Sequence, residues 1–176
     1  MRPLKREAAL LLIVAAVALS PLTALAAGPM VVSGGGTGTF EGDLDGDGEI
    51  DGSHFGLGVL LGGDGATRGH FECLMAGNTD ILGLALMAVE GKVTEATIDA
   101  GSATFSGIAT INLANGTIFR GVPFTATVMA GGPGSGQLRL TVIGAFDGVA
   151  GDSVPGNGNY DLPWETVSSG QIKIHQ

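Results

Sequence analysis

The chain has 176 residues, of which 32 are glycine and one is cysteine, and its formal net charge is −9. This length fits a single domain. The acidic balance argues against nucleic acid or anionic membrane surfaces as partners, because phosphate binding needs clustered Lys and Arg. A single cysteine allows no intrachain disulfide, so stability must come from apolar burial or from a bound ion.

Residues 1–26 have the layout of a secretory signal peptide. Three basic residues precede an apolar run over 8–19, and a small-residue motif ends at Ala26. The run is shorter than the roughly 20 residues that span a bilayer, so we expect cleavage after Ala26 rather than an uncleaved anchor. Removal of this segment takes away three of eight basic and one of seventeen acidic residues, so the mature chain has a net charge of −11 and no transmembrane segment. It is expected to be secreted or periplasmic.

The mature chain begins with a glycine-rich stretch. Residues 27–37 contain three consecutive glycines. Such a run resists ordering, because each glycine loses more backbone freedom than any other residue. The sequence predicts a linker here, with at most a brief strand at 30–32, followed by a single β domain over 38–176.

An acidic loop, residues 41–54 (EGDLDGDGEIDGSH), is the one stretch with a recognisable chemical pattern. Its carboxylates alternate, a glycine follows them, and a further aspartate closes the run. This is the ligand order of the first nine positions of an EF-hand calcium loop. The candidate metal ligands are Asp43, Asp45, Asp47, Glu49 through its carbonyl, and Asp51.

The EF-hand pattern is incomplete at its last position. His54 stands where an EF-hand has a bidentate Glu, and imidazole suits zinc or copper better than calcium. The flanking segments also read as strand or coil rather than helix. The loop therefore predicts weak calcium binding, with a dissociation constant of about 10⁻⁴–10⁻³ M or weaker. The alternative is an acidic hairpin tip that only repels and solubilises.

Period-two alternation and regular turn signals predict strands along the rest of the chain. The segment 81–89 is apolar on every face and fits a doubly buried strand or a short core helix, but Gly83 and its length favour the strand. The predicted strands are 54–61, 67–75, 81–89, 93–100, 103–113, 117–119, 124–129, 137–146 and 170–175.

Glycine-containing dipeptides separate these strands. Asp64-Gly65 and Asn115-Gly116 predict tight hairpin turns, the second in preference to a glycosylation acceptor. Breaks are also predicted at 77–78, 90–92 and 131–136. Residues 147–164 predict a long surface loop anchored by Tyr160 and Trp164. The fold class is therefore all-β, an antiparallel barrel or sandwich with Gly-rich hairpins, which the last strand can close.

Three patches resemble a known family. Residues 67–71 (TRGHF), 101–107 (GSATFSG) and 169–175 (SGQIKIH) are similar to small exported bacterial β domains of the post-COAP type. The resemblance implies the fold over residues 55–176 and no activity, because the function of that family is unknown. Two departures stand out: 131–140 lacks an acidic, asparagine-bearing hairpin, and the acidic loop looks like an addition.

No pattern in the chain predicts an enzyme. A phosphate loop, a nucleophile elbow and a zinc-ligand pair are missing from the sequence. His70 and Glu72 alternate on one face and could line a barrel mouth, but an exposed strand face explains them more simply. Cys73 alternates with apolar neighbours and reads as a small core residue rather than a reactive thiol.

Two function classes remain. The first is a secreted, non-catalytic structural or adhesive module, stiffened by calcium, with an extracellular or envelope partner. The second is a small-molecule carrier, which needs an empty cavity of roughly 300–1,000 Å³. Small residues are frequent in the chain, so a filled interior is expected. The residues that would line such a carrier are Leu57, Val59, Phe71, Phe105 and Phe124.

Overall fold

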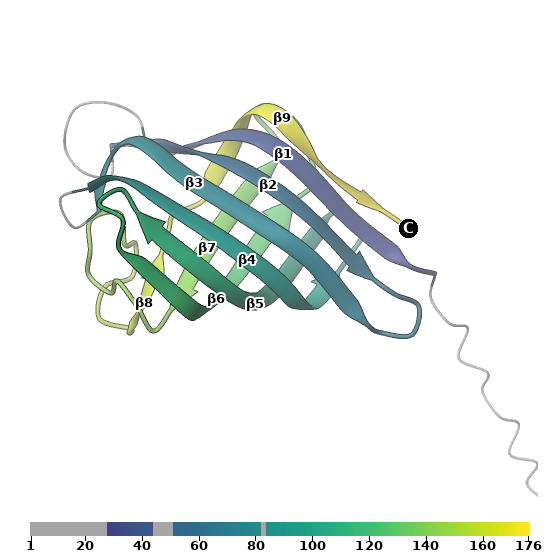
Figure 1. Ribbon diagram of the computed structural model, residues 1–176. Coiled ribbons are helices and arrows are strands. Elements are labelled where there is room, and N and C mark those ends of the chain that lie inside the picture. The colour runs from purple at the N-terminus through teal and green to yellow at the C-terminus, as the bar shows by residue number, and fades with distance from the viewer. Residues whose placement is uncertain (1–27, 44–50, 82–83) are drawn as a thin grey trace, which may run out of the picture.

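The structure is a computed structural model that describes residues 28–43, 51–81 and 84–176 (Figure 1). The signal-peptide prediction falls on residues outside this part. The described residues form strands and no helix, so this part of the chain has no helix that could cross a membrane. The nine strands are β1 Met30–Phe40, β2 Gly52–Leu61, β3 Thr67–Ile81, β4 Leu84–Ile98, β5 Ser102–Leu113, β6 Ile118–Met129, β7 Gln137–Ile143, β8 Asn159–Asp161 and β9 Glu165–His175.

All pairings are antiparallel, and the sheet closes into a barrel. Strands β1 to β6 pair with their neighbours in chain order. The ring closes because β6 also pairs with β7, β7 with β9, and β9 with β1. The short β8 pairs only with the far end of β7. The all-β prediction is confirmed, and of its two architectures the barrel is the one observed.

The predicted linker over 27–37 is wrong from residue 33 onward, because the brief strand allowed at 30–32 continues to Phe40. These residues belong to β1, which lies between β2 and β9 as a full member of the ring. Its glycines are ordered because β9 runs very close to them. A Cβ at Gly34 would lie 2.8 Å from the carbonyl oxygen of Gln171, and one at Gly36 would overlap the carbonyl of Ser169. Side chains at these two positions would push the strands apart.

Two predicted breaks are also wrong. Strand β3 continues past residues 77–78 to Ile81, with a register irregularity after Ala76. Strand β4 runs through residues 90–92. Gly91 faces the interior there, and a Cβ on it would come within 2.5 Å of the Phe124 ring. The glycine makes room for an aromatic ring and does not end the strand.

Other predicted features are confirmed. Residues 84–89 are strand. The strands predicted over 117–119 and 124–129 are joined in the single strand β6, which begins at Ile118. The Asp64-Gly65 and Asn115-Gly116 dipeptides form hairpin turns with positive φ at each glycine. The strand predicted over 137–146 ends at Ile143.

The interior is apolar and contains three neighbouring aromatic rings. Phe71 stacks on Phe124 with ring centroids 5.6 Å apart and meets Phe105 at 5.7 Å. All three side chains are buried. The long loop after β7 is held by Tyr160, which is fully buried and whose hydroxyl donates to the Ala150 carbonyl at 2.9 Å. Tyr160 is an anchor as predicted, but Trp164 is 37% exposed and is not.

Candidate functional site

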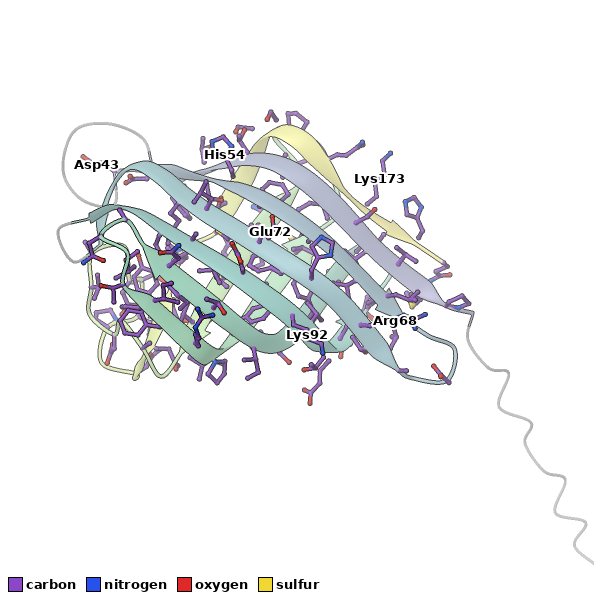
Figure 2. The ribbon with its side chains drawn as sticks, viewed as in Figure 1. Asp43, His54, Arg68, Glu72, Lys92 and Lys173 are labelled. Carbon is purple, nitrogen blue, oxygen red and sulfur yellow. The ribbon has the colours of Figure 1, made fainter. Side chains whose placement is uncertain are left out.

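The acidic loop connects β1 to β2 at one end of the barrel. Its two ends are held together by a hydrogen bond in which the Phe40 amide donates to the Asp51 carbonyl at 2.9 Å. Asp43 is exposed at this end, whereas Arg68 lies toward the other end (Figure 2). Asp51 is 2% exposed. The two ends of the loop therefore lie side by side, which allows carboxylates along it to point toward one ion.

The proposed calcium ligands are only partly within the described residues. Asp43 and Asp51 are described, whereas the predicted ligands Asp45, Asp47 and Glu49 lie outside that part of the chain. Within the described ranges, no group of three or more His, Cys, Asp or Glu side chains could hold a metal ion. His54 is exposed on the outer face of β2. The strands on both sides of the loop confirm that helices do not flank it.

A buried polar pair lies inside the barrel near the acidic loop. The Ser53 hydroxyl donates to Glu165 Oε2 at 2.5 Å, and the two residues are 2% and 1% exposed. Glu165 Oε1 is buried and has no hydrogen-bond partner among the described residues. Gly38 leaves room for this carboxyl group, because a Cβ there would come within 2.5 Å of Oε2. Sequence reasoning missed this pair.

Burial controls the protonation of this region. Desolvation raises the pKa of Glu165 to about 7, and the Ser53 hydrogen bond lowers it in part. Burial likewise raises the pKa of Cys73 far above its usual range, and the nearby Glu165 charge raises it further. Cys73 is 1% exposed and remains a thiol, because burial in apolar surroundings disfavours the thiolate. This supports its interpretation as a small core residue.

Carboxylates also organise the loop between β7 and β8. Asp147 accepts hydrogen bonds from the amides of Gly156 and Gly158 at 2.6 and 3.0 Å. Asp152 accepts from the amides of Gly148, Val154 and Asp161. Although its partial burial acts to raise the pKa of Asp152, these hydrogen bonds lower it overall. These aspartates hold the loop in its turns by accepting backbone hydrogen bonds. The Asp-Gly and Asn-Gly pairs in the loop sequence are typical of turns and could have indicated them.

The histidines do not converge with these groups. His70 and Glu72 are exposed on the outer face of β3, as is His175 on β9 (Figure 2 labels Glu72). In the strand register, His54 is opposite Leu74 and His70 is opposite Lys92. The pair of His70 and Glu72 therefore faces solvent rather than a barrel mouth. Ser53 and Glu165 are close enough for proton transfer but are enclosed by the packed interior.

In comparisons with known proteins, no family model, no curated protein and no solved structure matches the chain. The resemblance to the post-COAP domains therefore stays a prediction that rests on the three sequence patches.

Proposed function

We propose that the mature chain is a secreted or periplasmic, non-catalytic structural or adhesive β module. The observation that carries this proposal is the filled interior. Phe71, Phe105 and Phe124 are buried inside the barrel and contact one another, and the absence of a side chain at Gly91 leaves room for the Phe124 ring. A carrier would need an empty, lined cavity in that place. The partner of this module is a component of the envelope or of the extracellular surroundings.

A titration with a lipophilic fluorophore tests the packed interior. The folded protein, titrated with cis-parinaric acid up to about ten times its own concentration, should give no saturable increase in fluorescence, because a close-packed core has no space for a ligand. Phe124→Ala is expected to give no saturable increase either, because the cavity left by one ring takes up benzene-sized molecules and is too small for a long-chain fatty acid. Saturable binding of one fluorophore per wild-type chain would favour the carrier instead.

We further propose that the acidic loop binds calcium weakly through Asp43, Asp45, Asp47, Glu49 and Asp51, and thereby stiffens the module. What supports this is the ligand spacing, together with the hydrogen bond between Phe40 and Asp51 that closes the loop. An ion that binds only the folded chain raises its stability by mass action.

Calcium is expected to raise the melting temperature. At ten times a dissociation constant of about 1 mM the gain is about 1.4 kcal/mol, which corresponds to about 3–6 °C for a domain of this size. Differential scanning calorimetry with 10 mM calcium or with chelator measures it. Asp45→Asn and Asp47→Asn should each reduce the increase, and Asp64→Asn, on the exposed β2–β3 turn, is the matched control. An equal melting temperature with calcium and with chelator would contradict the proposal.

A further inference from the structure

A hollow opens on the outer surface where β7 changes its neighbour. Strand β7 pairs with β9 at Gln137 and Leu138, and with β8 from Thr141 to Ile143. Arg139 lies between these two pairings and is partly exposed, whereas the residues on either side of it are buried. The hollow has a volume of about 380 Å³ and is lined by Glu41, Arg139, Ser153, Pro163 and Trp164.

The strand register explains why residues far apart in sequence meet here. Phe40 at the end of β1 is opposite Glu165 at the start of β9. Glu41 and Trp164 are the next residues outward along their chains, so they lie beside each other. Both are exposed, Trp164 by 37%. The hollow therefore combines an indole with a carboxylate and a guanidinium.

The polar groups of the hollow keep unused hydrogen-bonding capacity. The Arg139 guanidinium makes one ion pair, from Nη2 to Asp161 Oδ1 at 3.7 Å, and its side chain is 35% exposed, so the terminal nitrogens can still donate to a ligand. Its Nε is buried and has no partner among the described residues. Asp161 itself is held by hydrogen bonds from Thr141 and Asn157, both at 2.7 Å. The Ser153 hydroxyl donates to the Asp161 carbonyl at 2.7 Å and can still accept. Donors and acceptors thus surround the indole.

We propose that this hollow binds a neutral sugar unit of a glycan. The apolar C–H face of a pyranose ring packs on the Trp164 indole, and its hydroxyls accept from Arg139 and donate to Glu41. A neutral ligand fits best because Asp161 already balances the Arg139 charge, while Glu41 disfavours an anion. This inference goes beyond the proposed function and depends on neither the packed interior nor calcium.

Trp164 provides a direct readout, because it is the only tryptophan in the chain. The folded mature protein is titrated with cellohexaose, chitohexaose and maltohexaose, and with polygalacturonate as an acidic glycan. We expect a saturable blue shift of tryptophan emission with at least one of the three neutral oligosaccharides, because a stacked sugar removes water from the indole. Isothermal titration calorimetry then gives the affinity.

Variants distinguish binding at this hollow from non-specific binding elsewhere on the surface. Trp164→Ala is expected to weaken binding at least about tenfold, equivalent to about 1.4 kcal/mol, and Glu41→Ala should also weaken it. Phe119→Ala is the matched control, because Phe119 has the same 37% exposure but lies on β6 and does not line the hollow. Melting curves show that each variant is folded. The inference is overturned if no neutral oligosaccharide gives a shift or heat at 10 mM, if only polygalacturonate binds, or if Trp164→Ala binds as tightly as wild type.

Discussion

Replacing Gly170 by alanine is expected to lower the free energy of unfolding by about 2–5 kcal/mol. Gly170 has φ = 80°, a left-handed conformation that costs a residue with a Cβ about 1–2 kcal/mol. A Cβ there would also overlap the backbone carbonyl of Gly35 on β1. Backbone cannot move aside like a side chain, so overpacking adds about 1–3 kcal/mol. Urea denaturation followed by circular dichroism measures the loss.

Gly116 offers a control that separates the two causes. It has nearly the same backbone conformation, φ = 83°, but lies in the β5–β6 turn, where a Cβ would meet no atom within 4 Å. Gly116→Ala should therefore lose only the conformational part, about 1–2 kcal/mol. If both variants lose the same free energy of unfolding, the close approach of β1 and β9 adds no cost to a side chain at Gly170. The explanation that the glycines of β1 are needed for that close approach would then be wrong.

Glycine is also where the sequence-based prediction of the fold was least successful. Turns were predicted correctly at Gly65 and Gly116, where the chain reverses and φ is positive. The same residue type was misread at Gly36 and Gly91, which lie inside strands at points of close contact. Those contacts join segments that are distant in sequence, so no local pattern reports them. The alternation of apolar and polar residues predicted most strands correctly, because a strand with one buried face shows this period-two pattern in its own sequence.

The candidate site was predictable to a similar, partial extent. The start of the acidic loop was placed correctly after Phe40, but its predicted end at His54 was wrong, because β2 already begins at Gly52. Glu165 was not identified, since a charged residue beside Trp164 reads as part of a surface loop. One signal was present: Glu165 alternates with Val167 and so shares its inward face. That a carboxyl group would be tolerated there depends on Ser53 and Gly38, which lie on other strands.

Between pH 4.5 and pH 7, Glu165 is expected to make the folded protein less stable as the pH rises. Its pKa is raised from 4.5 to about 7 by burial, so the folded chain holds this proton more tightly than the unfolded chain. The stabilisation that the protonated Glu165 carboxyl contributes is therefore fully present below pH 4.5, decreases between pH 4.5 and pH 7, and is absent above pH 7. At about 1.4 kcal/mol per pH unit, the total change is about 3 kcal/mol.

Glu165→Gln isolates this contribution, because the amide keeps the size of the side chain and can still accept from Ser53 but does not titrate. Relative to wild type, the variant should gain about 3 kcal/mol of stability between pH 4.5 and pH 8, measured by urea denaturation at several pH values. Glu72→Gln makes the same chemical change on the exposed outer face of β3 and is the matched control. Parallel pH profiles for wild type and Glu165→Gln would show that the buried carboxyl is not protonated in the folded state. The Cys73 thiol and the Ser53 hydroxyl are uncharged across this range, so they cannot hide such an effect.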